Sequence, residues 1–470
     1  MGASNNCRMN KIRILKTIKR SHYLLLSFII IFFVSCIINS DNDQDNMIRL
    51  MTLDPGHFHA ALIQKNMYEE LSPEVYVYAP GGNDLKQHLA RIRSYKRRDE
   101  DPTSWQETVY TGKDFFERML AEQPGNVVVL AGNNRKKTDY IVRSVGAGLN
   151  VLADKPMVIS PAEFPRLEEA FSIAEKNNVL LYDIMTERYE ITTMLQKALS
   201  ENTALFGKLV TGSPSEPAVT KESVHHFFKY VSGSPLTRPP WYFDIEQQGE
   251  GLADVTTHLV DLIQWECYPG TILSKEDIEI IDARRWPTVI SAGEFCKVTG
   301  LDEIPAYLKK DTTGGLMYIY ANGEISYRIK DTYARVVVEW KYRAPEGTGD
   351  THYSLMRGSR CDLIISQGRK EGYLPVLYLR AKNNTDISEK KLAGILAGLP
   401  WEGIRAEKTD ARAWKFIIPG KFKESHEEHF TRVTEKYIDY LEKGKLPEWE
   451  VPNMITKYYT TTEAIKKALE

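Results

Sequence analysis

The sequence predicts an α/β protein made of two parts. The first is an N-terminal, Rossmann-like doubly wound parallel sheet, and the second is a C-terminal α+β domain with an open-faced, largely antiparallel sheet. Short apolar segments alternate with helical stretches from Ile48 onwards, which is typical of a parallel sheet covered by helices. From about Asp277 one strand-like segment follows another. A chain of 470 residues, 42% of them hydrophobic, is long enough to form two hydrophobic cores.

The charge balance and the cysteines exclude some classes of protein. The 61 basic and 63 acidic residues give a formal net charge of −2, so no nucleic acid is expected as a partner. Five cysteines show neither the spacing of metal ligands nor that of a dense disulfide framework.

The first 36 residues are predicted to be a targeting segment. A basic region precedes the apolar run from Leu24 to Val34, which is short for a membrane span. The run ends in Phe33-Val34-Ser35-Cys36, which resembles a bacterial lipobox and implies acylation of Cys36; a plain signal peptide or a short anchor is the alternative. Residues 37–46 are predicted to form a flexible tether, and their acidic part resembles the export signal of surface lipoproteins in Bacteroidetes-type bacteria. We therefore expect an outer-membrane lipoprotein on the periplasmic or cell-surface side, attached only through its N-terminal lipid.

Residues 47–184 are predicted to form the parallel sheet. Its strands are expected at Ile48–Leu53, Glu74–Ala79, Asn126–Ala131, Asn150–Ala153 and Val179–Tyr182. The charged stretch from Arg91 to Trp105 is interpreted as a surface insertion.

The turn after the first strand carries an incomplete dinucleotide-binding motif. Asp54-Pro55-Gly56-His57-Phe58-His59-Ala60 stands where such proteins have Gly-x-Gly-x-x-Gly or Ala, and only Gly56 remains. The middle glycine lets the backbone approach a pyrophosphate, so binding remains possible. If a dinucleotide binds, we expect its pyrophosphate to lie towards residues 56–59 and the Asp54 carboxylate to turn away from it. After the second strand, Asp84 stands too far along the chain to be assigned to the ribose, which leaves NAD, NADP or no cofactor open.

His57 and His59 alternate in this turn and could suggest a pair of metal ligands. No third ligand is evident in the sequence, so we expect no metal and predict that both line the cofactor or substrate pocket.

The stretch from Gly249 to Trp265 is the predicted centre of the protein. A helix beginning near Asp254 would place Asp254 and His258 one turn apart on the same face. A carboxylate beside an imidazole is a useful acid/base pair. The alternative is that Asp254 only caps the helix and that His258 is a core histidine. Lys155 ends the apolar strand Val151-Leu152-Ala153-Asp154, and the ends of parallel strands are where ligands bind.

These two stretches together resemble the glucose-fructose oxidoreductase / inositol dehydrogenase (Gfo/Idh/MocA) family, from about Ile48 to the C-terminus. The resemblance implies hydride transfer to a nicotinamide cofactor, with Lys155, Asp254 and His258 jointly catalytic. It also implies that Asn134, in a turn similar to the family's Ala-Thr-Pro-Asn, joins Lys155 and the turn residues Gly56, His57 and Phe58 in binding a nicotinamide cofactor. That cofactor is expected to be NAD or NADP, either exchangeable or tightly bound.

A second group of residues is predicted to bind the substrate together with Asp254 and His258. The family's substrate pocket implies Glu187 and Arg188, for which an ordinary ion pair at a helix start is the alternative. His226 and Trp241 lie in what reads as an aromatic, proline-stiffened loop, and such residues suit the apolar face and hydroxyl edge of a sugar. Packing at a domain interface is the alternative for this loop.

Residues 185–470 are predicted to form the C-terminal domain. Asn322-Gly323 predicts a hairpin between strands at 315–321 and 324–330. Further antiparallel strands are expected at 335–343, 352–357, 361–366 and 375–380, and helices at 424–442 and 461–469. In the family the outer face of this sheet commonly forms dimers, which implies a homo-oligomer.

Three functions follow from these expectations. The first is an NAD(P)-dependent oxidoreductase acting at a ring hydroxyl of a sugar or sugar derivative. The second is a glycosidase that keeps its NAD and cleaves a glycoside by transient oxidation and elimination. The third is a non-catalytic carbohydrate-binding lipoprotein. The glycines missing from the dinucleotide-binding motif favour it, whereas the retained Lys155, Asp254 and His258 argue against it.

Overall fold

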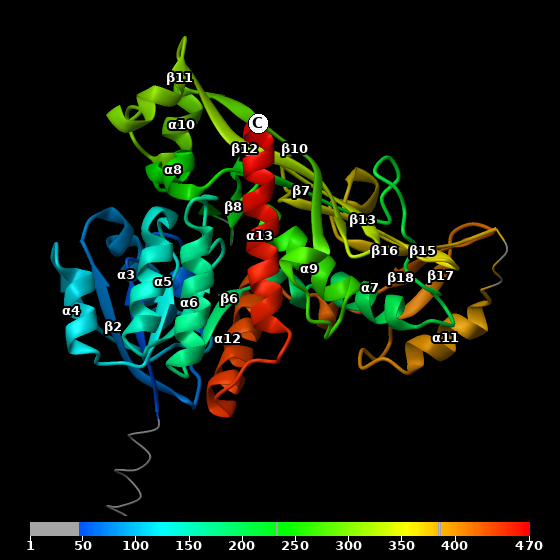
Figure 1. Cartoon of the computed structure of the whole chain (residues 1–470), viewed down its shortest axis with the longest axis horizontal. Coiled ribbons are helices and arrows are strands. Elements are labelled where there is room, and N and C mark those ends of the chain that lie inside the picture. Colours follow the sequence, from blue (N-terminus) through cyan, green and yellow to red (C-terminus); the bar gives the residue numbers. More distant parts are fainter. Residues whose placement is uncertain (1–46, 232–233, 384, 386) are drawn as a thin grey trace, which may run out of the picture.

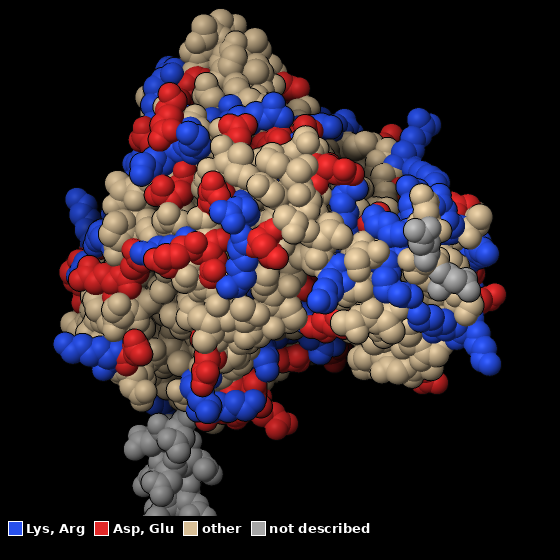
Figure 2. Space-filling model, turned by 45° about the vertical axis from the view of Figure 1, so that its right-hand side comes forward, with Lys and Arg blue, Asp and Glu red and all other residues tan. Residues whose placement is uncertain are grey.

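The computed structural model describes residues 47–231, 234–383, 385 and 387–470 (Figure 1). The predicted signal segment, Cys36 and the tether lie outside the described residues. Within the described part of the chain, no helix has both the length and the apolar character needed to cross a membrane. On the face seen in Figure 2, basic and acidic side chains are interspersed, so this face carries no large field of one sign.

The first sheet has six parallel strands in the order β3-β2-β1-β4-β5-β6, the order of a Rossmann fold. These strands are β1 (Ile48–Leu53), β2 (Leu71–Ala79), β3 (Gln106–Thr111), β4 (Val127–Leu130), β5 (Asn150–Asp154) and β6 (Leu181–Ile184). Strands β1, β4, β5 and β6 are almost wholly buried because helices cover both faces of the sheet. The predicted fold class is confirmed. Strand β3 is an exposed, polar edge strand that the apolar pattern does not reveal.

The last two helices of the chain pack against the first sheet rather than on the second alone. Helices α12 (His426–Lys443) and α13 (Glu450–Leu469), orange and red in Figure 1, run beside the N-terminal domain. Phe430, Tyr437 and Tyr458 belong to its hydrophobic core. The other helices of this domain are α2 (His59–Leu62), α3 (Asn83–Arg97), α4 (Phe115–Glu122), α5 (Lys137–Gly146) and α6 (Phe164–Lys176). The two domains therefore share a continuous packed boundary around the C-terminal helices.

The second sheet has ten strands, and only the pair β13–β7 is parallel. Its main strands are β7 (Val219–Phe228), β10 (Ile278–Ser291), β12 (Leu316–Ile329), β13 (Thr332–Arg343), β14 (Thr351–Arg357), β15 (Cys361–Ser366) and β16 (Val376–Ala381); β11 (Thr312–Thr313), β17 (Arg405–Lys408) and β18 (Ala413–Ile417) are shorter. Its helices are α7 (Ile191–Glu201), α8 (Ile245–Gln248), α9 (Thr256–Cys267), α10 (Ala292–Thr299) and α11 (Glu389–Ala397), and the two-residue strands β8 (Tyr230–Val231) and β9 (Ser234–Pro235) pair separately. Residues of α7, α9 and α13 share a hydrophobic core with one face of the sheet.

The predicted hairpin at Asn322-Gly323 is wrong. Strand β12 runs straight through these residues, and the chain reverses only between Ile329 and Thr332. The Asn322 side chain bonds the Trp286 carbonyl and the Trp340 amide, which ties it into the sheet. A side chain at Gly323 would begin 2.5 Å from a methyl carbon of Leu252, so this glycine makes room for the segment before α9.

The expected loop at His225-His226-Phe227-Phe228 is also wrong, because these residues form the end of the central strand β7. Phe227 and Phe228 are buried, as expected of a strand that is covered by helices and paired on both sides with β13 and β14. The strand places His225 on the wall of a cavity.

We predict that Gly251→Ala destabilises the protein, because the added methyl would lie 2.2 Å from the Ala321 carbonyl oxygen of β12. Overpacking of this kind typically costs about 1–3 kcal/mol. Urea unfolding followed by circular dichroism measures the loss. Gly293→Ala is the matched control, because nothing lies within 4 Å of its added methyl and the position is helical; unchanged or increased stability is expected there. Equal stability of Gly251→Ala and the wild type would contradict the close packing described here.

Candidate functional site

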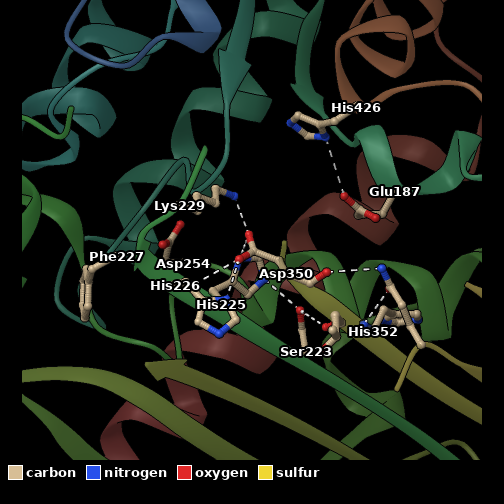
Figure 3. A network of polar contacts seen from close by, with 12 residues as sticks. Glu187, Ser223, His225, His226, Phe227, Lys229, Asp254, Asp350, His352 and His426 are labelled. Carbon is tan, nitrogen blue, oxygen red and sulfur yellow. Dashed lines mark hydrogen bonds and ion pairs between the residues drawn. The ribbon is translucent and has the colours of Figure 1, made fainter. Parts of the chain in front are cut away.

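A cavity of about 670 Å³ lies between the carboxyl edge of the first sheet and the inner side of the second domain (Figure 3). This size is typical of small-molecule sites. The cavity gathers most of the residues that the sequence singled out, namely His57, Phe58, Asn134, Lys155, Glu187, Asp254 and His258. Gly56, Arg188, His226 and Trp241 are not among its lining residues.

An ion pair between Lys155 and Asp254 joins the two domains at the floor of this cavity. Lys155 follows the end of β5, and its Nζ atom is 2.5 Å from Oδ1 of Asp254, which precedes α9. The side chains are only 11% and 7% exposed. Burial alone would raise the pKa of Asp254, but the Lys155 ammonium outweighs it and holds that pKa below its usual value.

His258 lies in the first turn of α9 and presents a free imidazole to the cavity. The helix begins at Thr256, so Asp254 stands just before it instead of within it. Burial, and then the charge of Lys155, hold the pKa of His258 well below its usual value, so the ring is neutral near pH 7. Its Nδ1 atom is buried and has no hydrogen-bond partner among the described residues. Such a ring keeps a lone pair that can accept a hydrogen bond from a bound ligand.

A second polar network, which the sequence analysis did not find, forms another wall of the cavity. Asp350 contacts Nδ1 of His225 at 3.0 Å and Nδ1 of His226 at 3.2 Å, and it also bonds Lys229. His225 Nε2 lies 2.7 Å from the Ser223 hydroxyl. The alternation of Ser223 and His225 on a strand was the available signal, and it was obscured because this segment reads as a loop.

Arg188 is not in the cavity, contrary to the prediction. Its guanidinium is 2.7 Å from both carboxylate oxygens of Asp261 and 2.7 Å from Glu450 on α13. The side chain is 8% exposed, and the two carboxylates raise its pKa further although burial opposes this. Arg188 therefore ties α9 and α13 together, which is closer to the alternative of a structural ion pair.

His57 and His59 have a third potential ligand after all. Nδ1 of His59 lies 2.9 Å and Nδ1 of His57 3.5 Å from the same carboxylate oxygen, Oδ2 of Asp154. These three side chains form a group that could hold a metal ion. The sequence argument that no third ligand exists was wrong, because Asp154 comes from a different strand and only the sheet brings it near.

The nicotinamide end of a dinucleotide would fit this cavity. The buried side chain of Asn134 donates to the Gln248 carbonyl at 2.7 Å, while its Oδ1 atom has no hydrogen-bond partner within the described part of the chain. That oxygen, together with His258 and Lys155, offers groups for a ribose and a substrate hydroxyl.

The pyrophosphate end of the usual groove does not fit in this conformation. The amides of Gly56 and His57 both donate to the Ala131 carbonyl, at 3.2 and 3.1 Å. A Cβ atom on Gly56 would lie 3.1 Å from the ring of Trp241, whose Nε1 donates to Asp84 at 2.8 Å. Trp241 thus lies against the glycine where a phosphate would approach.

The Asp54 side chain is held by a hydrogen bond from outside the turn. The Tyr140 hydroxyl donates to the Asp54 carboxylate at 3.0 Å, and burial raises the pKa of Asp54 although this bond lowers it. The position of a pyrophosphate relative to this turn stays a prediction.

We predict that Glu187 makes the stability of the protein depend on pH. Partial burial, with the side chain still 39% exposed, and the neighbouring Glu190 raise its pKa to about 7, above the value of 4.5 expected in the unfolded chain. A carboxyl group with a raised pKa stabilises the fold fully below about pH 4.5, and this contribution is lost as the pH rises through about 7. The melting temperature of Glu187→Gln relative to wild type should therefore increase from pH 5 to pH 8. Glu448→Gln, at an exposed position, gives the baseline; a difference that does not change with pH at Glu187 would refute the assignment.

The fold and the C-terminal domain match known oxidoreductases. Residues 195–469, more than half of the chain, match the family described as "Putative oxidoreductase C terminal domain". A structure from Parabacteroides merdae, described as a "putative oxidoreductase", is 53% identical, covers 90% of this chain and 98% of its own, and superposes with a TM-score of 0.88. No curated protein matches the chain.

More distant structures share the fold. A levoglucosan dehydrogenase in complex with NADH and levoglucosan is 11% identical, with a TM-score of 0.56 over 90% of this chain and 97% of its own. A 3-ketoreductase from Actinomadura kijaniata in complex with NADP and TDP-benzene is 12% identical, with a TM-score of 0.52 over 88% and 95%. These structures confirm the expected fold, and the matched domain family confirms an oxidoreductase; the finer likeness to the Gfo/Idh/MocA family stays a prediction. The chain belongs to the oxidoreductase family defined by this C-terminal domain.

Proposed function

We propose that the protein is an NAD(P)-dependent oxidoreductase that removes hydride from a hydroxyl-bearing carbon of a sugar or sugar derivative. The observation that carries the proposal is the half-buried, neutral His258, whose buried Nδ1 atom has no partner among the described residues, in the same cavity as the Lys155–Asp254 pair. The levoglucosan dehydrogenase with its NADH and sugar supports the same class of chemistry on this fold.

Each member of the trio has a role that its surroundings support. His258 accepts the proton of the substrate hydroxyl, because its lone pair is available at neutral pH. Lys155 places a positive charge beside the developing alkoxide. Asp254 holds the Lys155 ammonium in position through their 2.5 Å contact. A nicotinamide, when bound, would supply the hydride acceptor.

The walls of the cavity suit a polyhydroxylated ligand. Tyr242 and Trp340 offer apolar ring surface, while Glu187 and Asp350 offer carboxylate oxygens that accept hydrogen bonds from hydroxyl groups. Trp241 and His226 do not line the cavity themselves. Trp241 bonds Asp84, and His226 bonds Asp350, which lines the cavity.

We also propose that the protein is an outer-membrane lipoprotein acylated at Cys36 and a homo-oligomer. The support for oligomerisation is the outer face of β10 and β12, where Val289, Leu316 and Tyr318 are 44%, 39% and 38% exposed. Exposed apolar side chains on one sheet face are typical of a contact surface.

A second candidate function is carbohydrate binding without a redox cofactor. The contact of Trp241 with Gly56 favours it, because this contact closes the usual pyrophosphate position. Native mass spectrometry of the soluble protein separates the candidates: bound or titratable NAD(P) supports the oxidoreductase, and a sugar complex that excludes NAD(P) supports the binding protein. Sugar release without net NADH accumulation would instead indicate a glycosidase that regenerates its cofactor.

We predict that His258→Asn lowers turnover by roughly 10²–10⁴-fold, the usual contribution of a general base. The measurement is the rate of NAD(P)H formation over a panel of sugars, with circular dichroism to check the fold. His88→Asn is the matched control, because His88 is a buried histidine that lies on α3 outside the cavity. Full activity of His258→Asn would remove His258 from the reaction.

A further inference from the structure

Three potential metal ligands converge on one point at the edge of the first sheet. His57 and His59 come from the turn after β1, and Asp154 is the last residue of β5. The donor atoms all lie within 4.8 Å of one another, and all three residues line the cavity. Both imidazoles aim Nδ1 at the same Asp154 oxygen.

The separations match those between ligands of a single metal ion. Ligand atoms lie about 2.0–2.2 Å from zinc, so two of them are roughly 3.0–3.5 Å apart at octahedral or tetrahedral angles. The observed distances from Asp154 Oδ2 are 2.9 Å to His59 and 3.5 Å to His57. These two distances are compatible with three ligands of one ion.

One of the three potential ligand atoms forms no hydrogen bond when no ion is bound. His59 Nδ1 forms a hydrogen bond with Asp154, but His57 Nδ1 is buried and has no hydrogen-bond partner in the part of the chain that the structure describes. Its contact with Asp154 Oδ2, at 3.5 Å, is too long to offset the burial of a polar atom fully. A single cation would be coordinated by both imidazole nitrogens and by the Asp154 carboxylate oxygen.

The surroundings also support coordination. Burial lowers the pKa values of His57 and His59, so both rings are neutral and keep a lone pair. Burial would raise the pKa of Asp154, yet its contacts with His59 and His57 and the charge of Lys137 hold it well below its usual value, so the carboxylate stays charged. His59 Nε2 lies 3.4 Å from Nε2 of His426 on α12, which gives this ring the outer hydrogen-bond partner that metal-bound histidines usually have.

We propose that His57, His59 and Asp154 bind one divalent transition-metal ion of the zinc class. Two imidazole nitrogens and one carboxylate oxygen favour such ions over magnesium or calcium. The remaining coordination positions face the cavity, where they take an oxygen atom of the bound ligand. The Lys155 ammonium, next in sequence to Asp154, is held by Asp254 and leaves the site accessible to a cation.

The proposed metal site is tested independently of the proposed hydride transfer, because metal binding is measured without substrate or nucleotide. The test treats the soluble protein with a chelator, desalts it and titrates it with ZnCl₂ by calorimetry, with elemental analysis for stoichiometry. One Zn²⁺ per chain is expected. His57→Ala and His59→Ala should each weaken binding by about 100-fold or more.

His429→Asn is the matched control, because His429 lines the same cavity outside the trio. Its Zn²⁺ affinity should equal that of the wild type. If an alanine variant proves unstable, Co²⁺ absorption of Asp154→Asn provides the second readout: the visible bands of the wild-type complex should be lost or weakened. Absence of stoichiometric binding, or binding that survives His57→Ala and His59→Ala, would overturn the proposal. Equal loss in His429→Asn would likewise overturn it.

Discussion

The site depends on the buried contact between Lys155 and Asp254. Lys155 follows a strand of the first sheet, and Asp254 precedes the helix that the second sheet supports. Each charge is costly to bury alone, and their contact at 2.5 Å offsets part of that cost. The same contact fixes the start of α9, and with it His258, opposite the carboxyl edge of the parallel sheet. Two domains with separate cores thereby form one cavity.

Local patterns in the sequence were enough to predict five of the six strands of the first sheet and to single out Lys155, Asp254 and His258, which the cavity brings together. Four strands of this sheet are nearly continuous apolar runs, because helices cover both faces, and such runs stand out against polar connections. Asp254 and His258 were found by their four-residue spacing. That spacing is the same whether the helix begins at Asp254 or at Thr256. Lys155 was found because it ends a buried strand.

Features that depend on distant contacts were missed. Asn322-Gly323 has the composition of a hairpin turn, yet both residues lie within a strand. The Asn322 side-chain amide bonds the neighbouring strand, and the absence of a side chain at Gly323 makes room for Leu252. Arg188 was assigned to the substrate because nothing nearby in sequence reveals Asp261 and Glu450 as its partners. Asp154 escaped notice as a companion of His57 and His59 for the same reason. A single sequence does not display which strand ends meet.

The Lys155–Asp254 contact couples the two domains. A double-mutant cycle of unfolding free energies with Lys155→Met, Asp254→Asn and the double variant measures this coupling directly. We expect each single substitution to leave one buried charge without its partner, so the double variant should be less destabilised than the sum of the two. The expected coupling is about 1–3 kcal/mol. Additive effects, within about 0.5 kcal/mol, would contradict the claim.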